Sequence, residues 1–206
     1  MSARPRQNSD LEILQATFRA IARRGPTRLT LMEVAREANV SAASLVQRFG
    51  SKRALLLAAA ADTAGGHVYI FEGLRSKHRS PKAALLGLSE CMGMLGRTPE
   101  AVGYSLAFLQ ADLSDADFHR HSLARSRGFH DGLVTLVKEA MAAGELLKGD
   151  PNRLARALQA TLNGSMLEWT IHRKGRMASW VRRDLQTVLA PYCDNCRVHK
   201  PKSKLQ

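Results

Sequence analysis

One short segment of the sequence carries side chains of the kinds that contact DNA. Residues 42–49 have the apolar spacing of a short helix. In that helix four residues would point outward: Ala43, Ser44, Gln47 and Arg48. A helix of this size fits the major groove of DNA, with its N-terminal residues toward the bases. The chemistry that this segment predicts is recognition of DNA, with no bond made or broken.

Near the C-terminus lie three residues of the kinds that form zinc or redox sites: Cys193, Cys196 and His199. A structural zinc site needs four ligands, and no second pair stands near these three, so Cys91 would have to come from a distant segment. A thioredoxin-like pair also follows a strand, whereas this pair lies in a polar tail. We therefore expect no metal, and a metal or redox sensor is kept as an alternative.

Catalytic groupings are not evident in the sequence. No nucleophile, base and orienting residue can be placed together by spacing, and neither a glycine-rich phosphate loop nor a metalloprotease motif occurs. The sequence therefore predicts a protein that is not an enzyme. The enzyme alternative would need a cluster of carboxylates or histidines that the fold brings together.

Charge indicates a polyanionic partner. The chain has 206 residues, with 31 Lys and Arg against 18 Asp and Glu, and a formal net charge of +13. Residues 1–63 carry a net charge of +5, residues 64–191 carry +5 over twice the length, and residues 192–206 carry +3. An excess of this size predicts a nucleic-acid partner or a basic tail.

The compartment expected is the cytoplasm, with the protein associated with the nucleoid. Residues 1–10 are polar and lack the apolar segment of a secretory signal. The longest apolar run, Ala54–Ala61, is far shorter than the roughly 20 residues that span a membrane. Three cysteines cannot all pair, which suits a reducing compartment.

Helices on either side must hold the segment that would contact DNA. Apolar residues recur at steps of three and four, and alternating patterns are nearly absent, so the predicted fold is all-α. A first helix is predicted over 10–24, with Leu11 on its apolar face. Thr30 and Glu33 form a capping-box pattern that opens a second, short helix. Asn39 then permits a sharp turn, because asparagine tolerates positive φ.

Further caps divide the rest of the chain. Ser41 caps the helix 42–49, and Ser51 caps a fourth helix that runs to about residue 63. Proline after an N-cap residue marks later helix starts at Ser80-Pro81, Thr98-Pro99 and Asp150-Pro151. A long helix over 117–143 contains Gly128 and Gly132 as weak points, and the last helices are predicted over 151–173 and 178–190. The predicted domains are a DNA-binding domain (1–50), a regulatory and dimerisation domain (51–192, with a connecting helix over 51–63) and a basic, disordered tail (193–206).

The segment Leu29–Leu56 resembles the DNA-binding segment of the TetR family of bacterial transcriptional regulators. The resemblance covers about residues 10–60 and lies in several motifs in a fixed order: Arg24-Gly25, the turn from Val34 to Ser41, the helix from Leu45 to Phe49, and Ser51-Lys52 before Leu55. Two positions depart from the family pattern, because Asn39 replaces the turn glycine and Val46 stands where an aromatic residue is usual. The resemblance implies an N-terminal helix-turn-helix head and an all-helical ligand-binding and dimerisation body.

The resemblance also implies roles for individual residues. The residues expected to contact phosphate stand at or near helix N-termini, where the dipole favours anions, or on the recognition helix: Thr30, Ser41, Lys52 and Arg48. Those expected at base edges are Ala43, Ser44 and Gln47, of which the glutamine amide pairs well with adenine. Arg4 and Arg6 form a basic arm that could enter a minor groove.

For the body, the resemblance implies a homodimer in which helices 151–173 and 178–190 pair with their copies, and hence a palindromic operator. The expected function is a repressor, without a cofactor, that an apolar small-molecule effector releases from DNA. Methionine and aromatic side chains adapt to such ligands, and the candidates for a pocket are Met92, Tyr104, Phe108, Phe129, Met166 and Trp169. A DNA-binding protein that responds to no ligand is the alternative.

Overall fold

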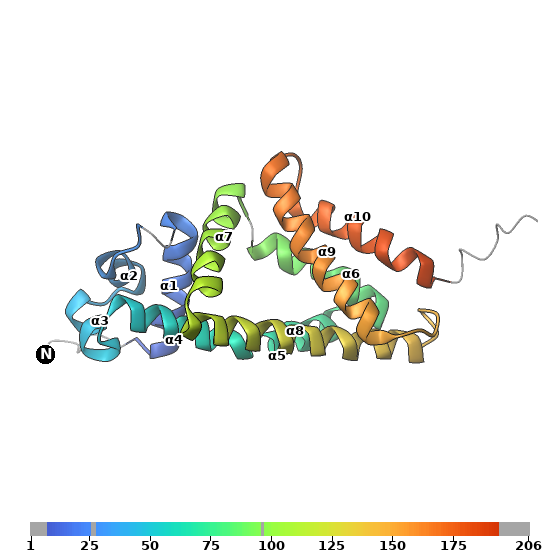
Figure 1. Cartoon of the computed structure of the whole chain (residues 1–206), viewed down its shortest axis with the longest axis horizontal. Helices are drawn as coiled ribbons and strands as arrows, with labels where there is room; N and C mark the ends of the chain where they lie inside the picture. The colour runs from blue at the N-terminus through green and yellow to red at the C-terminus, as the bar shows by residue number, and fades with distance from the viewer. Residues whose placement is uncertain (1–7, 26–27, 96, 194–206) are drawn as a thin grey trace, which may run out of the picture. The chain divides into compact units, whose positions relative to one another are not determined.

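The computed structural model of the protein describes residues 8–25, 28–95 and 97–193. These residues form ten α-helices and one short 3-10 helix and contain no strand, which confirms the all-α fold (Figure 1). They group into two compact units. The first unit contains the described residues up to His67 together with Arg97–Gly128, and the second contains residues 68–95 and 129–193.

The first unit is built around the N-terminal helices α1 (Asp10–Arg24), α2 (Leu31–Ala38), α3 (Ala42–Phe49) and α4 (Lys52–Gly65). Helix α1 packs on α2, on α4 and on α7 (Pro99–Ser114), while α3 packs on both α2 and α4. Buried side chains of α1 to α4 form one apolar core, to which α8 (Ala116–Ala142) contributes Phe118. The short helices α2 and α3 are therefore held by packing, since isolated helices of this length are unstable in water.

Caps set the starts of these helices. The side chains of Thr30, Ser41 and Ser51 each accept a hydrogen bond from the backbone N–H three residues further on, which confirms the three predicted starts. Ser9 and Glu12 form another capping box, at α1, which was not predicted.

The bounds of α1 are confirmed, but the assignment of Leu11 to its apolar face is wrong. Leu11 is 51% exposed, whereas Ile13 and Ala20 are buried. At 100° per residue, Leu11 lies on the side of the helix opposite to both of these residues. The apolar face is instead formed by buried side chains at Ile13, Leu14, Ala16, Ala20 and Ile21.

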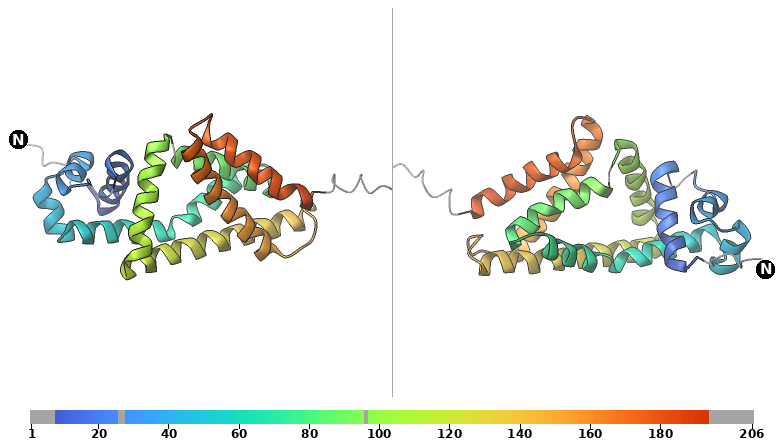
Figure 2. Two further views of the ribbon diagram at one scale, coloured as in Figure 1. Left: turned by 45° about the horizontal axis from the view of Figure 1, so that its top comes forward. Right: turned by 180° about the vertical axis from the view of Figure 1, so that it is seen from behind.

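The second unit contains α5 (His67–Lys77, apart from its first residue), α6 (Pro81–Leu95), the second half of α8, α9 (Pro151–His172) and α10 (Met177–Leu189). Helices α6, α9 and α10 pack on one another (Figure 2), and the 3-10 helix Ala190–Tyr192 follows α10. The predicted starts at Pro81 and Pro151 are confirmed, as is that of α7 at Pro99 in the first unit. Helix α5 was not predicted.

Two glycines of α8 allow rings to approach its backbone. A Cβ atom at Gly128 would overlap the imidazole of His67, and one at Gly132 would overlap the ring of Phe71. The ring of Phe71 also lies against that of Phe129, with 5.2 Å between centroids. The two glycines that the sequence marks as weak points of the helix are therefore packing sites, where only a hydrogen fits.

The segment Lys52–Lys77 is long and apolar enough, by length and composition alone, to cross a membrane. Several of its apolar residues are buried inside the protein, however. Leu55, Ala59 and Ala60 belong to the core of the first unit, and Phe71 and Leu74 are buried in the second. We therefore interpret the segment as two core helices, α4 and α5.

Candidate nucleic-acid interface

The α2–turn–α3 segment has the geometry of a helix-turn-helix. Asn39 ends α2 in the left-handed conformation, with φ 53° and ψ 46°, as its residue type predicts. The N–H of Val40 donates to the carbonyl of Ala35 over 2.9 Å, which closes the turn. Leu45, on the inner face of α3, is 0% exposed. Because Leu45 anchors one face of α3, the opposite face is turned outward.

That outward face carries the residues predicted at base edges. Ala43 and Gln47 are exposed and Ser44 is half-buried. Val46 is exposed as well, although large apolar side chains are usually buried. The face therefore combines an amide, a hydroxyl and small or apolar groups, which suits hydrogen bonding to base edges and contact with thymine methyl groups.

The N-termini of α2, α3 and α4 are each capped by a side chain. The Ser44 N–H donates to Ser41 Oγ at 3.0 Å, and the Ala54 N–H donates to Ser51 Oγ at 3.1 Å. At α2 the cap is reciprocal, because Thr30 N–H donates to Glu33 Oε2 at 2.8 Å, which lowers the pKa of Glu33. Thr30 and Ser41 are exposed and Lys52 is half-buried. Their phosphate role stays a prediction, and their capping role is structural in any case.

Arg48 has intramolecular partners. Its Nη1 donates to the carbonyl of Asn8 at 2.6 Å, and its Nη2 forms an ion pair with Asp10. The side-chain amide of Asn8 in turn donates to the carbonyl of Ala38, at the end of α2. A groove open to solvent lies here, and it is lined by Asn8, Ser9, Ser44, Gln47 and Arg48. The residues before α1 were not predicted to be part of this surface.

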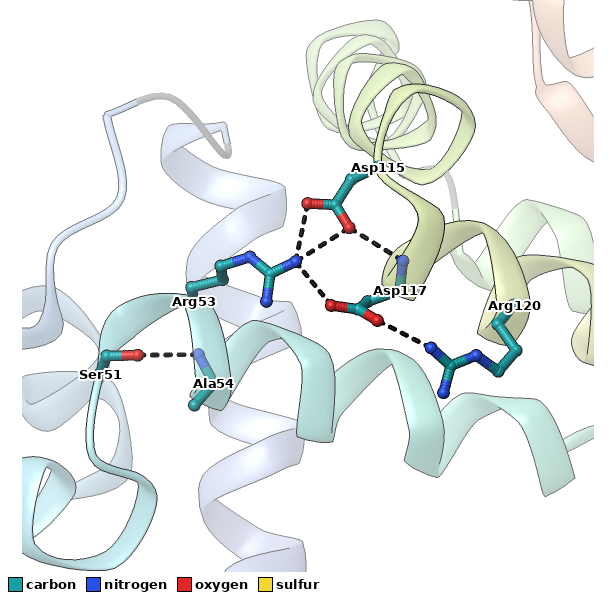
Figure 3. Close-up of polar contacts among 6 residues, drawn as sticks. All are labelled: Ser51, Arg53, Ala54, Asp115, Asp117 and Arg120. Carbon is teal, nitrogen blue, oxygen red and sulfur yellow. Dashed lines mark hydrogen bonds and ion pairs between the residues drawn. The ribbon is translucent and has the colours of Figure 1, made fainter.

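Arg53, next to Lys52, would be expected to face DNA by charge alone, yet it is bound elsewhere (Figure 3). Its Nη2 donates to both oxygens of Asp115 at 2.9 and 2.8 Å and to Asp117 at 2.9 Å. Arg120 donates to the other oxygen of Asp117 at 2.7 Å. The start of α4 is thereby tied to the α7–α8 corner within the first unit. The sequence signal for this network is a pair of acidic residues at the start of a long helix, where acidic side chains are favoured.

The Arg53 network predicts an acid-sensitive contribution to stability. Hydrogen bonds from Arg53 lower the pKa values of Asp115 and Asp117. A carboxyl group whose pKa is lowered by folding stabilises the protein above its unfolded pKa of about 4, and this contribution is lost as the pH falls through the lowered value. Arg53→Gln should therefore lower the urea midpoint at pH 7, and the difference from wild type should shrink at pH 3. Arg127→Gln, at an exposed position on α8 in the same unit, is the control. An equal difference at both pH values would contradict the assignment.

The residues proposed for a ligand pocket lie in both units. In the first unit, Tyr104 packs on α1, where a Cβ atom at Gly25 would lie 2.8 Å from the ring. In the second unit Met92 and Trp169 are buried, and Phe129 and Met166 are half-buried. Trp169 Nε1 donates to the Gly175 carbonyl at 3.1 Å, so its polar atom serves the α9–α10 turn. The side chain of Phe108 lies outside the described residues.

The remaining candidates fall partly outside the structure. Arg4, Arg6, Cys196 and His199 are not among the described residues. Cys193 and Cys91 are free thiols, and partial burial raises the pKa of the Cys91 thiol. Within the described part of the chain, no three His, Cys, Asp or Glu residues are grouped closely enough to hold a metal ion.

Sequence comparison assigns both parts of the chain to regulators. Residues 13–59 match the family model described as bacterial regulatory proteins of the tetR family. Residues 86–190 match the model described as the C-terminal part of BetI-type transcriptional repressors. Among curated proteins, none matches the chain significantly by sequence.

Solved structures with the same fold are distant in sequence. A TetR transcription regulator from Haloarcula marismortui has a TM-score of 0.74 and 18% identity, over 90% of this chain and 98% of its own. A regulator from Saccharomonospora viridis, solved in complex with choline, has a TM-score of 0.72 and 18% identity, over 88% and 95%. FadR from Bacillus subtilis, solved in complex with stearoyl-CoA, has a TM-score of 0.67 and 16% identity, over 88% and 98%.

Proposed function

Because the chain belongs to the TetR family of bacterial regulatory proteins, we propose that it is a homodimeric repressor of a palindromic operator, released from DNA by a small-molecule ligand. The general function follows from membership of this family: the chain is a DNA-binding transcriptional regulator, and not an enzyme. In this proposal, residues 1–50 form the domain that binds DNA, and residues 51–192 form the domain that dimerises and binds the ligand. The protein would act in the cytoplasm, on the nucleoid.

One observation carries the DNA-binding part of the proposal. The outward face of α3 bears Ala43, Ser44 and Gln47, while Leu45 on its other side is fully buried. A recognition helix needs this combination, because a helix that is firmly packed on one side can hold a few side chains of its other side against base edges. The caps at Thr30, Ser41 and Ser51 add backbone N–H groups at helix starts, which favour phosphate.

Dimerisation is supported by an exposed apolar stripe on α9. Ala160, Gly164, Leu167 and Ile171 recur at steps of four, three and four residues, and all four are exposed. A Cβ atom at Gly164 would meet nothing within 4 Å, so this position leaves room for a second helix. Apolar faces of this kind are usually covered by a partner. The occupant proposed is the same stripe of a second copy, since a two-fold interface is self-complementary.

The effector proposed is an apolar or amphipathic small molecule that the second domain binds. Two regulators of the same fold were solved with stearoyl-CoA and with choline. In this chain the half-buried Phe129 and Met166 are candidates for ligand contacts. An effector releases the repressor only if it binds the DNA-free conformation more tightly than the DNA-bound one.

Selection of duplexes from a random-sequence pool, followed by gel shift, tests the proposal. The expected result is an inverted repeat whose half-sites are separated by one helical turn or a multiple of it, as a two-fold dimer requires. Repeating the gel shift with fatty acyl-CoA thioesters and quaternary amines tests release. Failure to enrich any sequence would contradict the DNA-binding assignment, and an enriched single half-site would contradict the dimer. If none of the compounds weakens binding, the alternative without a ligand is favoured.

Base and phosphate contacts should respond differently to mutation. Gln47→Ala should relax the preference at particular base pairs by about 1–3 kcal/mol, because it removes a base contact. Lys52→Ala should weaken binding about equally on all sequences and lower the slope of log K against log salt by about one. Affinities measured at several salt concentrations, on the selected duplex and its single-base variants, separate the two. An unchanged slope for Lys52→Ala would show that the phosphate assignment is wrong.

A further inference from the structure

The residues just before α1 are bound to both helices of the helix-turn-helix. The side-chain amide of Asn8 donates to the carbonyl of Ala38, at the last residue of α2. The backbone carbonyl of Asn8 accepts from Arg48 on α3 at 2.6 Å, and Asp10 pairs with the same guanidinium. Segment Asn8–Asp10 therefore connects the end of α2 to α3. Asn8 and Arg48, which share one of these hydrogen bonds, are 40 residues apart in the sequence.

Arg48 is the residue that joins this segment to the recognition helix. Its side chain is 24% exposed, less than half the value of 66% for Asp10. A guanidinium has five N–H donors in a planar fork, so one side chain can hold a carbonyl and a carboxylate together. A lysine ammonium is compact and lacks this fork, and it cannot be expected to hold the same pair in the same geometry.

The segment forms one side of a groove whose other side is the reading face of α3. Asn8 and Ser9 come from the residues before α1, and Ser44, Gln47 and Arg48 come from α3. Ser44 and Gln47 thus line the same groove as the residues before α1. Side chains that read bases need such support, since loosely held groups lose discrimination.

We propose that Arg48 is a positioning residue for DNA recognition rather than a phosphate contact: it holds Asn8–Asp10 beside Ser44 and Gln47 and thereby sets the sequence preference of α3. This inference rests on the proposed DNA-binding function. It departs from the role implied by the family resemblance, in which Arg48 is a candidate for phosphate.

The two roles predict opposite effects of Asp10→Asn. If Arg48 binds phosphate, removing its carboxylate partner frees the guanidinium and raises the affinity for DNA. If Arg48 positions the segment, Asp10→Asn loosens it and lowers discrimination. The ratio of affinities for the selected duplex and for a scrambled duplex is the proper readout, because the general effect of removing a negative charge appears in both affinities and cancels.

The experiment compares wild type, Arg48→Lys, Asp10→Asn and the double variant on the duplex that wild type selects from a random-sequence pool. We expect each single variant to lower the specific-to-scrambled ratio about tenfold, in the range of one mismatched base pair. The double variant should be no worse than either single variant, because residues that act through one contact are not additive. The salt slope should stay within about 0.5 of the wild-type value, less than one phosphate contact. Arg36→Lys, an exposed position on α2, should leave the ratio unchanged.

Several results would overturn the inference. They are a ratio that rises in Asp10→Asn, additive losses in the double variant, or an Arg48→Met variant whose salt slope falls by about one. Thermal unfolding of each variant shows whether it is folded, and a variant that is not is replaced by Asn8→Ala, which removes the bond to Ala38 while leaving Arg48 in place. A wild-type chain that selects no sequence would overturn the proposed function and this inference together. A selective wild type with unaffected variants would overturn the inference alone.

Discussion

Replacing Ile171 with aspartate is expected to make the chain monomeric and to lower its affinity for a palindromic duplex by about a thousandfold. Ile171 is 63% exposed on α9 and lies in the same stripe as Leu167, which is 44% exposed. A charge placed within an apolar interface is desolvated without a partner when two copies meet. Because a monomer contacts one half-site only, most of the specific affinity is lost, toward the range of non-specific binding.

Sedimentation velocity and gel shift on the selected duplex measure this effect. Tyr69→Asp, at a side chain that is 78% exposed on α5, is the matched control in the same unit. Both substitutions are at solvent-exposed positions of the protomer, so neither should lower its thermal stability much. If Ile171→Asp stays dimeric, the interface does not include this part of α9. If Tyr69→Asp becomes monomeric instead, the interface lies on α5.

Replacing Gly132 with alanine is expected to lower the free energy of unfolding by about 1–3 kcal/mol, although alanine is the better helix former. The added Cβ would overlap Cε2 of the Phe71 ring, which also packs against Phe129. The ring cannot move without disturbing that contact, so the substitution overpacks the second unit. Urea unfolding followed by circular dichroism measures the change.

Gly73→Ala provides the matched control. Gly73 is a helical glycine in α5 of the same unit, and a Cβ atom there would meet nothing within 4 Å. With no steric overlap, the helix preference of alanine should raise stability by about 0.5–1 kcal/mol. The same chemical change should thus have opposite signs at the two sites. Stabilisation by Gly132→Ala would mean that α8 does not approach Phe71 so closely.

Local signals predicted the first unit well because its helix ends are determined by adjacent residues. Thr30, Ser41 and Ser51 accept their capping hydrogen bonds from residues three positions away, and Asn39 takes the left-handed conformation that its type allows. These interactions span a few residues and leave a pattern in the sequence. Helix α5 leaves no such pattern, since Gly65 and Gly66, which have no side chain to cap with, precede His67, and it was missed.

Of the candidate site, only those features that follow from helical periodicity were predicted. The residues of α3 that face outward follow from the burial of Leu45, and the structure places Ala43 and Gln47 there. The partners of Arg48 and Arg53 could not be predicted. Arg48 bonds to Asn8, 40 residues away, and Arg53 bonds to Asp115, 62 residues away. Charge counting treats both arginines as available to DNA, yet both are bound within the protein.

By itself, the sequence determined the all-α class, the helix-turn-helix with its caps, and the membership of a family of DNA-binding regulators, because each of these depends on residues within a few turns of one another. Tertiary structure alone decided which basic residues are already paired, which glycines must remain glycines for packing, and which apolar residues of α9 are left exposed. These properties depend on helices that are distant in sequence, and the chain places them together only when it folds.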